Sequence, residues 1–305
     1  MGQAVARELE LWSNEWVPSA PIIWTTPEEF RSSITTAIDE FYVNLCNGEL
    51  WTIYWCAGLG TVAAGPIIID GEYERAKIFI ECLKRRMGEA APNGTIFYSS
   101  SAGGIYGASE DTLISEESNV AVSSSYGAMK FHVENLFRQW ASDAHGRVAI
   151  GRISNLFGQG QNIQKQQGLI SAACLALLKQ QPLGIFVSLD TTRNYLYVAD
   201  AAKIITHFTM KVMRMPVGSQ ELKIVCSPYN LSIAAVLYEI RKVFGRKPAV
   251  GFGNRLEMPT YTRNLSLMSI RHVELDPLQF TPMSIAIAET RRELLRELMD
   301  GLLAP

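Results

Sequence analysis

The sequence lacks the cysteine patterns of a metal site or of a disulfide framework. It has five cysteines, an odd number, and they are widely scattered with no CxxC pair: Cys46, Cys56, Cys82, Cys174 and Cys226. Zinc sites and small disulfide-rich domains use paired, closely spaced cysteines. We therefore expect reduced thiols and no bound metal.

Long runs of one residue type are missing as well. The net charge is −2 without a block of like charge, so a nucleic-acid partner is not expected. No apolar run reaches the length that spans a membrane. The first residues include Glu8 and Glu10 and do not form the basic-then-apolar pattern of a signal peptide. These absences predict a soluble, cytoplasmic protein.

What the sequence contains is an alternation of strand and helix patterns. Apolar, β-prone runs at 51–56, 94–98 and 147–152 alternate with helical patterns, among them one at about 73–86. Such alternation predicts an α/β fold with a parallel sheet that is covered on both faces. Ligands of these sheets bind beyond the carboxyl ends of the strands. In this chain those ends are followed by Cys56–Gly60, Ser99–Ser101 and Ile153–Asn155.

The flanking segments are also expected to be mostly helical. Thr26, Pro27 and two acids form a good helix start, and that helix should run to about Leu45. Residues 2–9 form an amphipathic helix pattern that opens with Gly2. Beyond Gly158 a polar loop leads to helices at about 168–179, 200–213, 232–244 and 283–303, with short strands at 184–187, 195–198 and 222–226.

Tyr126 and Lys130 stand four residues apart at the head of a helical pattern, so they share one face of the helix. A phenol has an unperturbed pKa of about 10. A neighbouring ammonium favours the phenolate and lowers that value. The pair can therefore exchange protons with a substrate hydroxyl or carbonyl oxygen. Such a spacing also arises by chance, and only the surrounding motifs make it informative.

Four motifs in order resemble the extended short-chain dehydrogenases/reductases, the NAD(P)-dependent nucleotide-sugar epimerase/dehydratase group. The resemblance covers roughly Cys56 to Asp200. The motifs are the serine run 97–101 leading to Ile105-Tyr106-Gly107, the Tyr126/Lys130 pair, the segment 151–160 (GRISNLFGQG), and the segment 192–200 (TRNYLYVAD).

The resemblance implies a Rossmann-like, doubly wound parallel sheet whose first strand is absent or degraded, with a smaller, mixed C-terminal part that binds substrate. The cofactor domain would be 1–157. Residues 158–305 would mostly form the substrate part, with about 190–215 returning to the main sheet. A homodimer is expected from the same resemblance.

The resemblance also implies roles for individual residues. Tyr126 would be the acid/base, and Lys130 would bind the nicotinamide ribose. Ser101 would form a hydrogen bond with the reacting oxygen. Ser100 is the alternative, because the spacing to Tyr106 is one residue longer than usual. The remaining predicted roles are contacts with NAD or NADP by Gly2, Cys56, Ala57, Gly58, Ser99, Ile153 and Ser154, and contacts with a nucleotide-sugar substrate by Asn155 and Arg193.

Two departures from the family pattern bear on function. The glycine-rich turn and its strand are missing, so that Gly2 resembles the tail of the motif. The sequence thus indicates either a truncated chain or a degraded cofactor site, and we expect the former. In the sugar dehydratases acidic residues follow the catalytic Ser/Thr, whereas this chain has Ala102 and Gly103. That difference favours an epimerase or a ketone reductase.

The sequence therefore predicts an NAD(P)-dependent epimerase or oxidoreductase of a nucleotide sugar, acting within polysaccharide synthesis. The alternative from another class is a non-catalytic relative that keeps the fold and binds a dinucleotide or sugar as a sensor or scaffold. A reductase of small ketones is a third interpretation, which the long C-terminal half disfavours.

Overall fold

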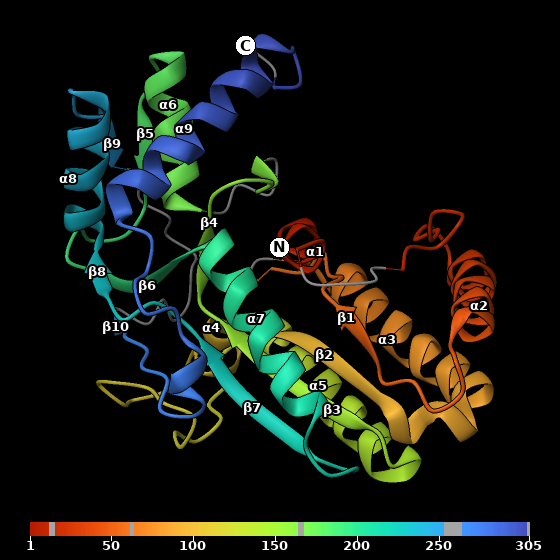
Figure 1. Ribbon diagram of the computed structural model, residues 1–305. Coiled ribbons are helices and arrows are strands. Elements are labelled where there is room, and N and C mark those ends of the chain that lie inside the picture. The colour runs from red at the N-terminus through yellow and green to blue at the C-terminus, as the bar shows by residue number, and fades with distance from the viewer. Residues whose placement is uncertain (12–15, 62–63, 164–167, 253–263, 304–305) are drawn as a thin grey trace.

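The computed structural model describes residues 1–11, 16–61, 64–163, 168–252 and 264–303. Its centre is a sheet of four parallel strands, in the order β1-β2-β3-β7 (Figure 1). These strands are β1 (Trp51–Trp55), β2 (Gly94–Ser101), β3 (Arg147–Ile153) and β7 (Gln220–Val225). Every residue of β3 is buried, as expected for an inner strand covered on both faces.

Three helices pack on one face of this sheet: α2 (Pro27–Asn44), α3 (Pro66–Met87) and α5 (Ser125–Ala144). The start of α2 is fixed by a capping box, in which Thr26 and Glu29 satisfy each other's backbone N–H groups. Buried aromatic side chains fill the space beneath the helices, with Trp55 stacked on Phe79 at 4.4 Å between ring centres.

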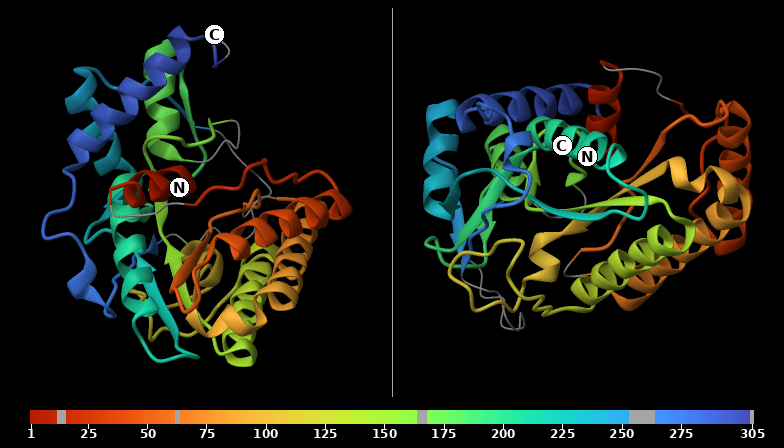
Figure 2. Two further views of the ribbon diagram at one scale, coloured as in Figure 1. Left: turned by 45° about the vertical axis from the view of Figure 1, so that its right-hand side comes forward. Right: turned by 60° about the horizontal axis from the view of Figure 1, so that its bottom comes forward.

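The other face is covered by α7 (Val198–Met213) and by the short helix α1 (Gly2–Leu9). Figure 2 shows α7 on the side of the sheet opposite to α3 and α5. Ala4 and Val5 of α1 are buried in the same apolar cluster as α7 residues such as Ala201 and Ile205. The alternation of strand and covering helix is thus the doubly wound α/β arrangement that the sequence predicts.

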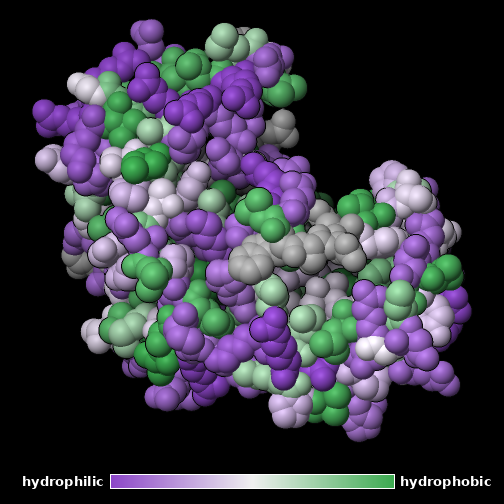
Figure 3. All heavy atoms as spheres, in the orientation of Figure 1, coloured by the Kyte–Doolittle hydropathy of each residue, from purple (hydrophilic) through white to green (hydrophobic). Residues whose placement is uncertain are grey.

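The C-terminal part adds smaller sheets and three helices. The strands β4 (Asn155–Phe157), β6 (Thr192–Tyr197), β8 (Asn230–Ser232) and β10 (Asn264–Leu265) form one mixed sheet, and β5 (Leu183–Ile185) pairs with β9 (Val250–Phe252). The helices are α6 (Leu169–Lys179), α8 (Ile233–Phe244) and α9 (Met283–Met299). Short helical turns lie at α4 (Ala102–Ile105), η1 (Gly88–Asn93) and η3 (Val273–Leu275). In Figure 3 the surface is hollowed between the helices α6 and α9 and the α2–α3 side of the sheet.

The predicted fold class is confirmed, with differences in the bounds of several elements. The serine run 99–101 belongs to β2 itself, because Ser101 is still paired with Ile153 of β3. Helix α3 begins at Pro66, seven residues before the predicted start, because Pro66 provides a favourable first helical position. In the described residues no strand precedes Trp51, and β1 is an edge of the sheet. The predicted domain boundary at 157/158 stays a prediction.

Candidate active site

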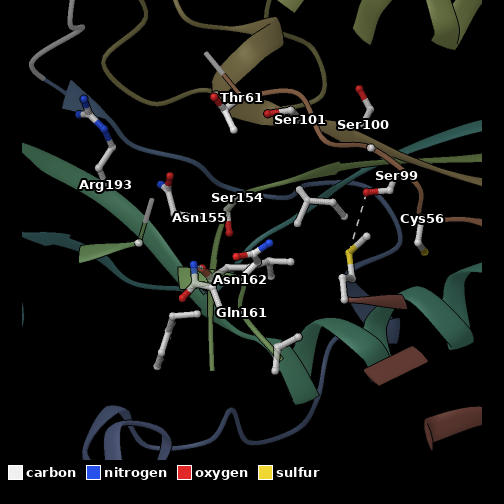
Figure 4. Close-up of a pocket in the computed structure, with 18 of the residues that line it drawn as sticks. Cys56, Thr61, Ser99, Ser100, Ser101, Ser154, Asn155, Gln161, Asn162 and Arg193 are labelled. Carbon is white, nitrogen blue, oxygen red and sulfur yellow. Dashed lines mark hydrogen bonds between the residues drawn. The ribbon is translucent and has the colours of Figure 1, made fainter. Parts of the chain in front are cut away.

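A pocket of about 650 Å³ opens at the carboxyl ends of β1, β2 and β3. Most of the predicted site residues line it, although they come from distant parts of the chain: Cys56, Gly58, Ser99, Ser100, Ser101, Tyr126, Ile153, Ser154, Asn155 and Arg193. Figure 4 shows Cys56 at one end of the pocket and Arg193 at the other, with Ser154 and Asn155 between them. The position at the strand ends is the one expected for ligands of parallel sheets.

Tyr126 lies in the first turn of α5, where Ser124 caps the helix by accepting the N–H of Gly127. Its half-buried ring is held between two glycines from different segments. A Cβ atom on Gly60 or on Gly104 would come within 3.1 Å of a ring atom of Tyr126. The absence of side chains at these two positions therefore gives the ring its place.

Lys130 lies one turn further along α5 and is buried. Its ammonium forms an ion pair with Glu72 at 2.7 Å and approaches the Ser99 carbonyl oxygen at 3.4 Å. It lies 5.7 Å from the centre of the Tyr126 ring and 5.4 Å from that of Tyr98. Burial works to lower the pKa of Lys130, but the hydroxyls of Tyr98 and Tyr126 and the Glu72 carboxylate outweigh it, so the pKa lies above its ordinary value.

The serine run distributes its hydroxyls in different directions because β2 remains extended through Ser101. Ser100 points away from the pocket, where it donates to Glu134 at 2.6 Å (Figure 4). Ser99 approaches the sulfur of Met1 at 3.9 Å. Ser101 caps α4 by accepting the Gly104 N–H at 3.1 Å. Since that bond uses only an acceptor site of the hydroxyl, the hydrogen of Ser101 is left to donate.

Behind the serines lies a buried polar network that connects the three elements of the site. Arg152 of β3 binds Glu134 of α5 through two nitrogens, at 3.0 and 2.8 Å, and donates to the Tyr106 hydroxyl at 2.6 Å. Ser100 of β2 donates to the same Glu134 carboxylate. Bidentate guanidinium–carboxylate bonds are directional as well as strong. The network therefore fixes the strand ends relative to α5.

The far end of the pocket carries the predicted substrate residues. The Asn155 amide donates to the backbone oxygen of Asn194 at 2.9 Å, and Arg193 donates to that of Thr192 at 2.8 Å. Asn155 and Tyr195 are paired where β4 meets β6. The Ser154 hydroxyl is buried without a hydrogen-bond partner among the described residues. A buried hydroxyl of this kind is satisfied when a ligand or water reaches it.

The predicted cofactor residues at the near end lie together. Gly2 is close to Cys56, since a Cβ on Gly2 would be 3.5 Å from the Cys56 Cβ. Burial raises the pKa of the Cys56 thiol to about 12, so that thiol is neutral at physiological pH. Ala57 packs against the apolar core beneath α3, and Gly58 lines the pocket.

Several lining residues escaped the sequence prediction. Thr61 lies three residues past Gly58, and Gln161 and Asn162 belong to the polar loop predicted beyond Gly158, so their proximity in sequence was the available signal. Glu72, which contacts Lys130, had no such signal because 58 residues separate the two. In the described part of the chain there is no group of three or more metal-ligating side chains, and no helix is long and apolar enough to cross a membrane.

Comparison with known proteins shows which family the central part of the chain is similar to. Residues 72–220 match the profile of the NAD dependent epimerase/dehydratase family. The matched stretch is just under half of the chain. The stretch includes Tyr126, Lys130 and the serine run, and the resemblance seen in the sequence is thereby confirmed.

Curated relatives of the family match over part of the chain. The dTDP-4-dehydro-6-deoxyglucose reductase of Escherichia coli is 28% identical over 157 residues, which are 52% of this chain and 48% of the relative. The UDP-glucose 4-epimerase of Azospirillum brasilense is 30% identical over 171 residues, 51% of this chain and 48% of the relative. The chain thus spans about half the length of these curated relatives in the matches.

Solved epimerase structures share the fold over nearly the whole chain. The UDP-glucose 4-epimerase of Thermotoga maritima with UDP-glucose superposes with a TM-score of 0.76 and 14% identity, covering 97% of this chain and 95% of that one. The UDP-glucose 4-epimerase of Thermus thermophilus in complex with NAD gives a TM-score of 0.75 with 15% identity, and coverages of 96% and 95%. At these identities the likeness supports the Rossmann-like fold.

Proposed function

We propose that the protein is an NAD(P)-dependent epimerase or oxidoreductase that acts on a nucleotide-activated sugar. The observation that carries the proposal is that Tyr126 of α5 and Ser101 of β2 line one pocket, with the buried Lys130 ammonium 5.7 Å from the centre of the Tyr126 ring. The family match of residues 72–220 supports it.

The chemistry follows from the groups at the pocket. Bound NAD(P) supplies the nicotinamide that accepts or returns a hydride. Tyr126 takes the proton of a sugar hydroxyl as its carbon loses the hydride, so that the alcohol becomes a ketone. The Ser101 hydroxyl, whose hydrogen is left to donate, forms a hydrogen bond with the reacting oxygen. Return of hydride and proton on the opposite face gives the epimer, whereas release or reduction of a keto sugar corresponds to a dehydrogenase or reductase.

The near end of the pocket fits a dinucleotide. Gly58 lines the pocket and has no side chain beyond hydrogen, which lets a ligand approach the backbone closely. The buried Ser154 hydroxyl, unpartnered in the described residues, is available to a bound group beside Ile153. Cys56, Ser99 and the Lys130 ammonium would complete the contacts with NAD or NADP.

The far end of the pocket fits the substrate. Arg193 offers a planar guanidinium, which suits a diphosphate, and Asn155 offers an amide to sugar hydroxyls. The Thermotoga structure was solved with UDP-glucose, and the Escherichia coli relative is named for a dTDP-sugar. We therefore propose UDP- and dTDP-sugars as the substrate class. The predicted homodimer and cytoplasmic location stay predictions.

Calorimetric titration with NAD(H) and NADP(H), followed by turnover assays with UDP- and dTDP-sugars, tests the proposal. We expect cofactor binding and sugar-dependent turnover, and Tyr126→Phe should lower kcat by about 10²- to 10⁴-fold. Tyr238→Phe is the matched control, because Tyr238 is exposed on α8 and should leave turnover unchanged.

Two results would overturn the proposal. One is the absence of cofactor binding, which would favour the sensor or scaffold interpretation. The other is full turnover by Tyr126→Phe, which would remove Tyr126 from the chemistry.

A further inference from the structure

The Glu72 carboxylate lies at the base of the site and has no role in the mechanism described above. It belongs to α3, and its side chain is 10% exposed. One carboxylate oxygen contacts the Lys130 ammonium at 2.7 Å, and the other accepts the Gly60 N–H at 2.9 Å. The two oxygens are thus held by α5, which also carries Tyr126, and by the loop at Gly60, which packs against the Tyr126 ring.

Glu72 is also close to Tyr126 itself. A Cβ atom on Gly60 would lie 2.9 Å from a Glu72 oxygen and 3.1 Å from a Tyr126 ring carbon. The carboxylate and the phenol ring therefore both lie against Gly60, with no side chain between them at that position. At such a distance a negative charge that is shielded from water acts strongly on a neighbouring titrating group.

Other elements contribute few competing charges at this point. Tyr98 of β2 keeps its proton, because burial raises its pKa above the ordinary value. The Cys56 thiol is neutral, and the chain's amino terminus lies near it. Glu134 of α5 is engaged by Arg152 of β3. Among the described residues, Glu72 is the carboxylate in ion-pair contact with Lys130.

We propose that Glu72 is a positioning residue, which holds the Lys130 ammonium beside Tyr126 and offsets its positive charge. Lys130 alone would strongly favour the phenolate of Tyr126, and the carboxylate moderates that effect. This inference rests on the proposed role of Tyr126 for its meaning in catalysis, but it can be tested without turnover.

The test is a spectroscopic titration of the Tyr126 phenol by its phenolate absorbance. Four proteins are compared: the natural chain, Tyr126→Phe, Glu72→Gln, and the double variant. Subtracting each Tyr126→Phe trace from its parent isolates the signal of one tyrosine. Burial raises the pKa of Tyr54 to about 12, so this residue contributes little below pH 10. We expect Glu72→Gln to move the Tyr126 midpoint to lower pH by about one unit.

Glu74→Gln is the matched control. Glu74 is on the same helix and carries the same charge, but it is exposed and paired with Lys77. That substitution should leave the midpoint unchanged. If Glu72→Gln does not fold, Glu72→Asp serves instead, because its withdrawn carboxylate weakens the Lys130 contact and should give a smaller shift in the same direction.

The outcomes separate this inference from the proposed function. A midpoint that stays in place or rises in the Glu72 variant overturns the inference, even if the natural chain turns over sugar. A downward shift in a chain that binds no NAD(H) or NADP(H) supports the role of Glu72 and overturns the proposed function.

Discussion

Helix α5 carries two buried ion pairs one turn apart, and they are satisfied to different degrees. Arg152–Glu134 is almost wholly buried and bidentate; Glu134 also accepts a bond from Ser100, and Arg152 donates one to the Tyr106 hydroxyl. Lys130–Glu72 is joined by one short contact of 2.7 Å, and it lies beside Tyr126, which lines the pocket. A guanidinium has a fixed, planar set of donors, whereas an ammonium is a compact charge on a flexible stem. The first pair suits a fixed frame, and the second suits a group that must also meet a ligand.

The largest expected difference is in stability. Arg152→Met should lower the free energy of unfolding by about 3–5 kcal/mol, because Glu134 is left buried and unpaired. Lys130→Met should cost less, about 1–3 kcal/mol, since Glu72 keeps the Gly60 N–H. Urea denaturation at neutral pH measures both values. Equal losses in the two variants would contradict the distinction between the pairs. The double variant Arg152→Met, Glu134→Leu should recover much of the stability that Arg152→Met loses.

The tyrosine beside each pair gives a smaller contrast. Tyr106 and Tyr98 are both fully buried, but the Tyr106 hydroxyl accepts a bond from Arg152, whereas that of Tyr98 has no partner in the described residues. Tyr106→Phe should therefore cost about 1.5–3 kcal/mol, the usual value for a bond to a charged group. Tyr98→Phe should change the stability by less than about 0.5 kcal/mol, because it removes an unsatisfied hydroxyl. Thermal and urea unfolding of the two variants measure these changes. A loss of stability of equal size in both variants would contradict the prediction.

The smallest expected effect depends on pH. Burial raises the pKa of Tyr98 above the unfolded value of about 10, so the folded chain holds a proton that the unfolded chain releases. This contribution is complete below about pH 10 and is lost as the pH rises beyond it. Between pH 9 and 11, Tyr98→Phe should therefore lose about 1 kcal/mol less stability than the natural chain. Urea midpoints at pH 9, 10 and 11 measure the difference, and parallel curves would contradict it.

Local chemistry made much of the fold predictable. The helix α2 was expected from Thr26 and Pro27, and the structure shows the capping box that these residues begin. The β-prone runs at 51–56 and 147–152 became β1 and β3 nearly as predicted. These features depend on residues within a few positions of one another, which a single sequence displays directly.

The contacts that organise the site were not predictable in the same way. Glu72 meets Lys130 across 58 residues, and Arg152 meets Tyr106 across 46. Both contacts arise only when the parallel strands and their crossover helices are assembled, and no periodic pattern in the sequence predicts them. The end of β2 was also misplaced, since serine is common in turns and only the pairing with β3 extends the strand to Ser101.

The serine run has a consequence for how the strand tolerates change. Side chains alternate between the faces of an extended strand, so a shift of one residue exchanges the inward and outward positions. In β2 the buried position at Ser100 and its neighbours Ser99 and Ser101 all carry hydroxyls. After such a shift, Glu134 would still find a hydroxyl donor and the pocket would still find another. The triple serine therefore keeps a hydroxyl on both faces of this strand end under a one-residue shift in pairing, although the same shift would exchange the faces of Phe97 and Tyr98.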